Sequence, residues 1–131
     1  MTRNPERPLS PHLQIWRWGP AMLISILHRA SGIALTVAGL ALLAWWLCAL
    51  ATGGEHFDTF VGAMNHWAGI VVLLGLTWAF WQHLLSGIRH LVLDIGAGYE
   101  LRTNRFFSIL IVVGSIFLTA LTWAIGTGAI A

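Results

Sequence analysis

The sequence contains no lysine, a single cysteine and few charged residues of either sign. Only 9% of its 131 residues are Asp, Glu, Lys or Arg, whereas an ordinary soluble domain carries about 25%. This scarcity of charge excludes such a domain. The lone cysteine, Cys48, excludes a disulfide within the chain. It lies in an apolar run, where a small buried or lipid-facing side chain is the simplest interpretation.

Motifs of common soluble enzymes are also missing from the sequence. There is no phosphate-binding glycine loop, no nucleophile elbow, and neither C-x-x-C nor H-E-x-x-H zinc spacing. Any chemistry of this chain therefore has to come from the polar residues inside its apolar segments.

What the sequence has is three long apolar runs. No charged residue occurs in 30–54 or in 106–131, and the only ionisable side chains in 59–88 are two histidines. Each run exceeds the roughly 20 residues that a helix needs to cross a bilayer, and none shows the alternation of a membrane β-barrel. We therefore predict an all-α membrane protein with one membrane-anchor domain, residues 1–131. Its three transmembrane helices are expected at about 21–52, 61–93 and 106–130.

The seven basic residues are all arginine, and they are distributed asymmetrically. Four lie in or next to the N-terminal segment and three surround the second connection, but none lies in the first connection or at the C-terminal end. By the positive-inside rule the N-terminus is cytoplasmic (or in a mitochondrial matrix) and the C-terminus is periplasmic. The net charge of +2 thus reflects topology, and nothing indicates nucleic acid as a partner.

We expect neither a signal peptide nor a transit peptide. The first apolar run is too long for a signal-peptide core, and residues 1–7 are too short for an amphipathic targeting helix. The expected location is a bacterial inner membrane, with a processed organellar protein as the alternative. Residues 1–20 are expected to form a cytoplasmic or interfacial segment, in which Ser10 and Pro11 suit the N-cap and first turn of a short helix.

The second run ends in an unusual group of ionisable residues. On a helix His83, Gly87 and His90 fall at i, i+4 and i+7 and share one face. If Asp94 marks the cytoplasmic interface, His83 lies eleven residues, or about 16 Å, deeper. Polar groups at that depth are costly and are usually functional. We interpret His83 as an axial ligand of haem iron, beside a glycine that lets a flat cofactor approach the backbone. The alternative is a neutral histidine hydrogen-bonded to a neighbouring helix.

A second polar stripe lies near the cytoplasmic end of the first run. Ser25, His28, Arg29 and Gly32 recur there at i, i+3, i+4 and i+7. A hydroxyl, an imidazole and a guanidinium on one stripe suit an acidic or carbonyl-bearing ligand at the membrane edge, and a quinone head group and a haem propionate both fit. The alternatives are that Arg29 snorkels to the lipid headgroups and that His28 is simply interfacial.

The remaining polar residues of these runs are less informative. His90 lies one to two turns from the interface, where contact with headgroups and contact with a haem propionate fit equally well. Arg89 and Asp94 fit a plain interfacial anchor pair. We assign no chemistry to His12, His56 and His66. Three helices close poorly around a cofactor, so we expect a partner membrane subunit.

Three motifs together resemble a known family. Residues 7–13 read RPLSPHL, residues 25–29 read SILHR and are followed by Ser31 and Gly32, and residues 83–94 read H-x-x-x-G-I-R-H-L-x-x-D. Their order, their spacing and the three-span layout resemble the cytochrome b556 subunit of succinate dehydrogenase over nearly the whole chain. Trp16 stands where that family often has a tyrosine or another residue.

The resemblance implies one of the two small membrane anchors of respiratory complex II, whose three helices form half of a heterodimeric haem-binding bundle. The flavoprotein and iron–sulfur subunits of such a complex oxidise succinate, and electrons reach ubiquinone at the cytoplasmic edge of the anchor. The chain itself would be a subunit that is not catalytic alone.

The resemblance also implies roles for individual residues. The residue matching His83 is one axial ligand of haem b, and the partner anchor subunit supplies the other. Residues matching His28, Arg29 and His90 meet the haem propionates, and those matching Ser25 and Arg29 line the ubiquinone site.

Two other functions stay open on the sequence. A haem-free structural anchor, as in some fumarate reductases, would not need His83. A haem-b subunit of another oxidoreductase, such as a hydrogenase, usually carries both ligands in one chain. Here His28 and His90 are both expected nearer the cytoplasmic side than His83.

The predicted topology can be tested with reporter fusions. Alkaline phosphatase, which is active only outside the cytoplasm, should be active when fused after Ala131 and inactive when fused after Arg105, because the arginines stay inside. Activity of a cytoplasmic reporter after Ala131 would contradict either the number of spans or their direction.

Overall fold

The computed structural model describes Glu6 and residues 18–129. The short helix expected from Ser10 and Pro11, the first of the three motifs and the last residue of the third expected span all fall outside the described residues.

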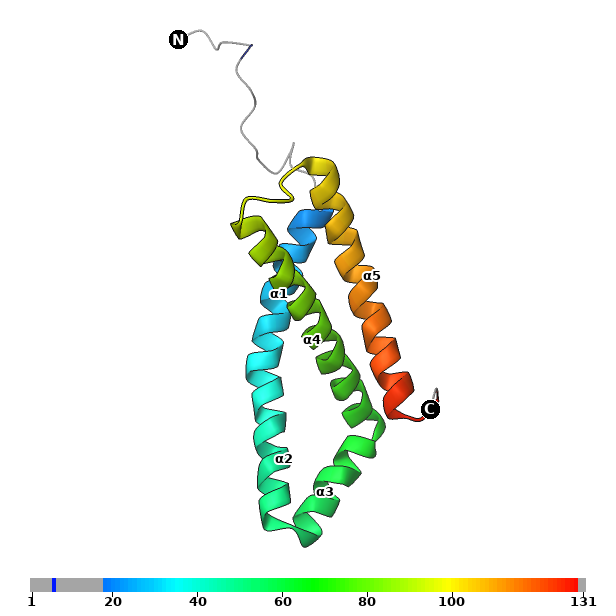
Figure 1. Ribbon diagram of the computed structural model, residues 1–131. Coiled ribbons are helices and arrows are strands. Elements are labelled where there is room, and N and C mark those ends of the chain that lie inside the picture. Colours follow the sequence, from blue (N-terminus) through cyan, green and yellow to red (C-terminus); the bar gives the residue numbers. More distant parts are fainter. Residues whose placement is uncertain (1–5, 7–17, 130–131) are drawn as a thin grey trace.

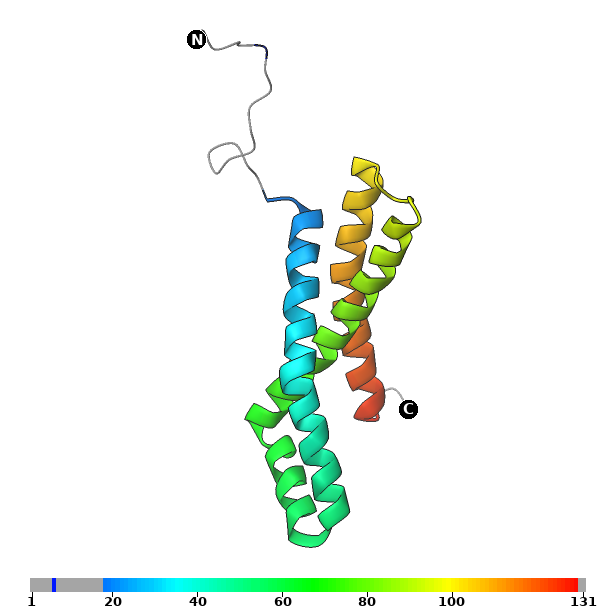
Figure 2. The ribbon, with the colours of Figure 1, turned by 90° about the vertical axis from the view of Figure 1, so that its left-hand side faces the viewer.

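The described residues form helices joined by short connections and include no β-strand, so the all-α prediction is confirmed. A first continuous helical run consists of α1 (Pro20–Ala34), the π-helical turn η1 (Leu35–Gly39) and α2 (Leu40–Thr52). The helices α3 (Gly54–Asn65), α4 (Trp67–Asp94) and α5 (Leu101–Gly126) follow. Figures 1 and 2 show the first run as one column, beside which α4 and α5 lie at an angle.

Three of these helical runs are long and apolar enough to cross a membrane: Pro20–Thr52, Trp67–Asp94 and Leu101–Gly126. The first matches the expected span of 21–52. The third begins five residues before the expected 106, because the turn that carries Arg102 and Arg105 is helical as well.

The boundary expected at residue 61 for the second span is wrong. Residues 61–65 belong to α3, and α4 begins only after His66, whose backbone is extended (φ −69°, ψ 148°). The ring of His66 caps the new helix by accepting a hydrogen bond from the N–H of Ala68 (3.3 Å). Gly69 then lies against the end of α3, where a Cβ atom would stand 2.7 Å from the Cα of Met64. Hydropathy cannot detect this break, because residues on both sides of it are uncharged.

The two ends of the molecule differ in character. The start of α1, the end of α4 and the start of α5 lie together at one end, next to the α4–α5 loop (Figure 1). At the other end α2 and α3 form a hairpin that extends beyond the end of α5 (Figures 1 and 2). The hairpin turns at Gly53, which has a φ of 63° in the left-handed region that favours glycine.

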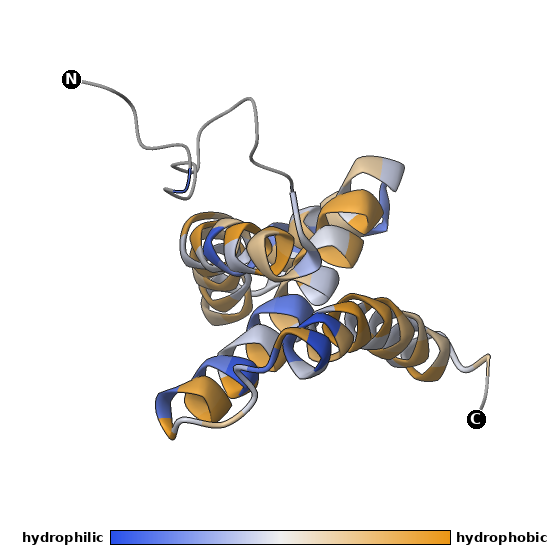
Figure 3. Cartoon of the chain, turned by 90° about the horizontal axis from the view of Figure 1, so that it is seen from above, coloured by the Kyte–Doolittle hydropathy of each residue, from blue (hydrophilic) through white to orange (hydrophobic). Residues whose placement is uncertain are grey.

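The interior is small and largely polar, while apolar side chains face outward. Figure 3 shows apolar residues along most of the length of the helices, and many of the large apolar side chains are exposed. Among the largest side chains that are fully buried, only Ile24 is apolar; the others are Gln82, Ser86, Ser108 and Ser115. Small and polar residues at helix contacts are typical of membrane proteins, in which lipid competes with apolar contacts between helices but not with hydrogen bonds.

Hydrogen bonds between side chains hold α4 against α5. The amide of Gln82 is at their centre: its nitrogen donates to the Ser86 hydroxyl (3.2 Å), and its oxygen accepts from the Ser115 hydroxyl (2.9 Å). Farther along, the indole of Trp81 donates to Thr122 (3.0 Å) and that of Trp123 donates to Thr77 (3.3 Å). These bonds fix the register of α4, the helix that carries His83.

Candidate functional site

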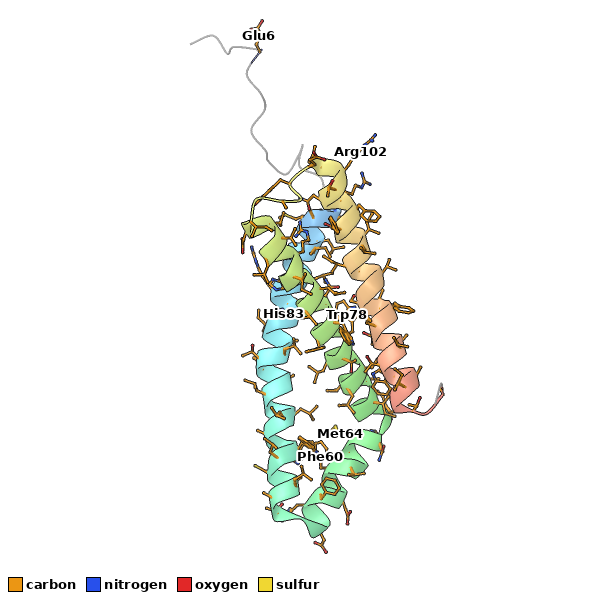
Figure 4. The ribbon with its side chains drawn as sticks, viewed as in Figure 1. Glu6, Phe60, Met64, Trp78, His83 and Arg102 are labelled. Carbon is orange, nitrogen blue, oxygen red and sulfur yellow. The ribbon has the colours of Figure 1, made fainter. Side chains whose placement is uncertain are left out.

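His83 lies where α4 packs against α1, and it is labelled in Figure 4. Its Nδ1 atom is 3.0 Å from the backbone carbonyl oxygen of His28 and 3.3 Å from the hydroxyl oxygen of Ser31. The His83 side chain is half-buried, whereas Ser31 is only 3% exposed. The two motifs that carry these histidines, separate in the sequence, therefore meet at one point.

The glycine at position 32 makes this approach possible. A Cβ atom on Gly32 would stand 2.9 Å from Cε1 and 3.3 Å from Nδ1 of His83. A side chain at this position would push the imidazole away from α1. Gly32 therefore lets the ring lie directly on the backbone of the neighbouring helix.

Three imidazoles form a row along this face. The rings of His28 and His83 are stacked, with centroids 4.2 Å apart and planes 16° from parallel. His90 continues the row: its ring centroid is 5.1 Å from that of His28, and its side chain is exposed. His28 thus lies between the deep histidine and the one near the end of α4. The sequence had suggested that His28 and His83 differ in depth, but their rings are in contact.

His83 lies at a similar distance from the ends of two different helices. From the end of α4 at Asp94, His83 is eleven residues, or about 16 Å, along the helix. From the start of α1 at Pro20, its neighbour Gly32 is twelve residues, or about 18 Å, along the helix. Both counts place the imidazole about three helical turns from the end of the bundle where the α4–α5 loop lies.

Ser25 and Arg29 lie on the same stripe of α1 as Gly32, toward the start of the helix. Ser25 is half-buried and Arg29 is exposed. Neither has a side-chain hydrogen bond or ion pair with any residue that the structure describes. Gly32, at the inner end of the stripe, lies against His83, so the stripe that carries this hydroxyl and guanidinium ends at the imidazole.

Gly87 lies on the histidine face of α4, as its spacing predicted. A Cβ atom there would be 3.9 Å from Nε2 of His28, which is an ordinary contact. The glycine therefore lies beside His28, without being required by crowding within the chain.

Arg89 and Asp94, interpreted from the sequence as a plain interfacial anchor pair, form no ion pair with each other in the described part of the chain. Arg89 instead donates a hydrogen bond from Nη2 to the side-chain oxygen of Asn104 on α5, and Asp94 is exposed. On the helical wheel Arg89 points away from the histidine face, toward α5. Its hydrogen bond joins α4 to α5.

The donor set fits a haem ligand better than an enclosed metal site. In the described part of the chain, no three His, Cys, Asp or Glu side chains are placed to hold a metal ion. His28 cannot be the axial ligand opposite His83 in this arrangement, because the two rings stack directly on each other. A metal on His83 would need its remaining ligands from a macrocycle and from another chain.

Comparisons with known proteins agree with this geometry. Residues 3–122 match the family described as succinate dehydrogenase/fumarate reductase transmembrane subunit. The succinate dehydrogenase cytochrome b556 subunit of Paracoccus denitrificans is 43% identical over 117 residues, which cover 89% of each chain. That of Rickettsia felis is 36% identical over 118 residues, or 90% of this chain and 91% of the relative. The mitochondrial cytochrome b560 subunit of Sus scrofa is 35% identical over 124 residues, or 88% of this chain and 72% of the relative.

Proposed function

The chain belongs to the succinate dehydrogenase/fumarate reductase transmembrane subunit family, and we propose that it is the cytochrome b membrane anchor of a succinate:ubiquinone oxidoreductase. Its relatives carry the name of that enzyme's cytochrome b subunit. The chain holds the flavoprotein and iron–sulfur subunits at a bacterial inner membrane, with its N-terminus in the cytoplasm and its C-terminus in the periplasm. The succinate site lies on those other subunits, so the chain is not catalytic alone.

His83 is the residue that binds haem b in this proposal. It is an imidazole near the middle of the bilayer, it is held through Nδ1, and its Nε2 has no hydrogen-bond partner among the described residues. A bound haem supplies one-electron chemistry at this depth. The single observation that carries the proposal is this free nitrogen on an otherwise fixed ring. A haem-free anchor would have no use for it.

The second axial ligand comes from a partner anchor subunit. The stacking of His28 on His83 excludes His28 from that role. The open surface of the three helices, on which apolar side chains as large as Phe80 and Phe117 are half-exposed or more, leaves room for further helices as well as lipid. In this proposal each of the two anchor subunits supplies half of the haem-binding helix bundle.

His28, Arg29 and His90 bind the haem propionates. Arg29 and His90 are exposed, and the ring of His28 contacts those of both His83 and His90. A guanidinium and two imidazoles can donate charge-assisted hydrogen bonds to carboxylates.

Ser25 and Arg29 contribute to the ubiquinone site. They share one stripe of α1, close to the end of the bundle where the α4–α5 loop lies. A hydroxyl donor and a fixed positive charge stabilise the negative charge that develops on a quinone carbonyl oxygen during reduction. An iron–sulfur subunit docked on this end of the anchor would deliver electrons to a quinone bound near Ser25 and Arg29.

Replacing the haem ligand tests the proposal directly. In the assembled complex, His83→Leu should remove the reduced haem-b absorption bands or reduce their intensity severalfold, because the imidazole nitrogen proposed to bind the iron is lost. His56→Leu, which changes an exposed histidine on α3, is the matched control and should leave the bands unchanged. A His83→Leu complex with wild-type haem content and spectrum would refute the assignment.

The quinone site is tested by separating two activities. Ser25→Ala should lower succinate-to-ubiquinone electron transfer about tenfold, the effect of losing roughly 1.4 kcal/mol of stabilisation. Succinate oxidation with a soluble dye should persist, since it needs only the peripheral subunits. Thr36→Ala removes an exposed hydroxyl eleven residues along the same helical run, and should affect neither activity. If an intact Ser25→Ala complex shows unchanged quinone reduction and unchanged quinone affinity, Ser25 is not part of the ubiquinone site.

A further inference from the structure

The hydrogen bonds of His83 define which of its ring nitrogens carries the proton. The nearest partner of Nδ1 is the backbone carbonyl oxygen of His28, at 3.0 Å. A carbonyl oxygen only accepts hydrogen bonds, so Nδ1 must donate and must carry the proton. In a neutral imidazole the other nitrogen then holds a lone pair. The contact with α1 therefore leaves Nε2 in the form that binds a metal.

The hydroxyl of Ser31 completes this arrangement. Its hydrogen is directed to the carbonyl oxygen of His28, at 3.0 Å. Its oxygen is also 3.3 Å from Nδ1 of His83. Because the hydroxyl hydrogen is used on the carbonyl, the lone pairs of Oγ remain to accept from Nδ1. The Ser31 hydroxyl oxygen is thus a second acceptor for the N–H of His83, and it is hydrogen-bonded to the first acceptor, the His28 carbonyl oxygen.

The surroundings keep the ring from turning away from these acceptors. Ser31 is 3% exposed, so water does not replace its hydroxyl. On the other side Gly32 lets the ring approach so closely that even a Cβ would be 2.9 Å from Cε1. Rotation of the ring by 180° would put a carbon against the His28 carbonyl and remove the hydrogen bond that Nδ1 donates to it.

We infer that Ser31 is a positioning residue, which holds His83 in the Nδ1-protonated tautomer and strengthens its Nε2 as a donor to haem iron. The inference rests on the proposed function, because it presumes that haem binds at His83. Metal-binding histidines generally donate their other N–H to a carbonyl or carboxylate, which makes the ligand more basic. Here a buried hydroxyl is added to the carbonyl. A more basic ligand stabilises the ferric form, so the hydroxyl lowers the reduction potential of the haem.

The test is a redox titration of the haem absorption bands in the purified complex. Ser31→Ala should retain the haem but raise its reduction potential, since one acceptor of the Nδ1 proton is lost. Ser31→Thr keeps a hydroxyl that can bond the same carbonyl, and should restore the wild-type value. If Ser31→Ala does not assemble, Ser31→Cys gives the same test, because a thiol keeps the size but is a weak acceptor.

Ser108→Ala is the matched control for this experiment. Ser108 is also buried, at 1% exposed, and its hydroxyl also donates to a backbone carbonyl of its own helix, that of Asn104 (2.7 Å), but it has no contact with His83. Its replacement should leave the haem potential unchanged, which separates the effect at His83 from a general loss of a helix-bound hydroxyl.

The outcomes also separate this inference from the proposed function. A wild-type complex without haem bands, or a His83→Leu complex that keeps them, would defeat the proposed function. Normal haem in the wild type, together with an unchanged or lower potential in Ser31→Ala, would overturn only the role of Ser31.

Discussion

Every polar group that enters the hydrocarbon layer must find its hydrogen-bond partner inside the protein, because lipid offers none. The contacts between helices in this chain follow from that requirement. The amide of Gln82 joins α4 to α5 through Ser115, and Nη2 of Arg89 bonds to Asn104 nearer the α4–α5 loop. On the other side of α4, His83 bonds to the backbone of α1. Apolar packing contributes little to the choice of neighbour, since lipid tails satisfy apolar side chains equally well.

The same requirement explains the form of the site. Nδ1 of His83 is satisfied within the chain, whereas Nε2 has no partner among the described residues. Gly32 and Ser31 produce this asymmetry, because one admits the ring to the helix surface and the other bonds the carbonyl that the ring approaches. A ligand bound to Nε2 would thus supply the partner that the contacts between helices do not provide. The stacked ring of His28 cannot do so, which is why the proposed site needs a partner subunit.

The sequence predicts well what depends on composition and helical spacing. The three apolar helical runs and the common face of His83, Gly87 and His90 follow from counting residues along helices. What depends on how helices cross could not be predicted. A serine in a helix usually bonds its own backbone, so nothing in the sequence distinguishes Ser31 from Ser108 as a neighbour of an imidazole on another helix. Arg89 has an acidic residue five positions away, yet its partner is on α5. The break at His66 depends on one extended residue between uncharged segments.

The most direct measurement is an electron cryo-microscopy structure of the assembled complex, purified with its partner anchor. We expect a haem between the two anchor subunits, with iron bound to Nε2 of His83 on one side and to a side chain of the partner on the other. The Nδ1 atom of His83 should still face the carbonyl of His28. A haem held by both axial ligands from this chain, or a complex in which Nε2 of His83 bonds to another helix and no haem is present, would contradict this assignment of the site.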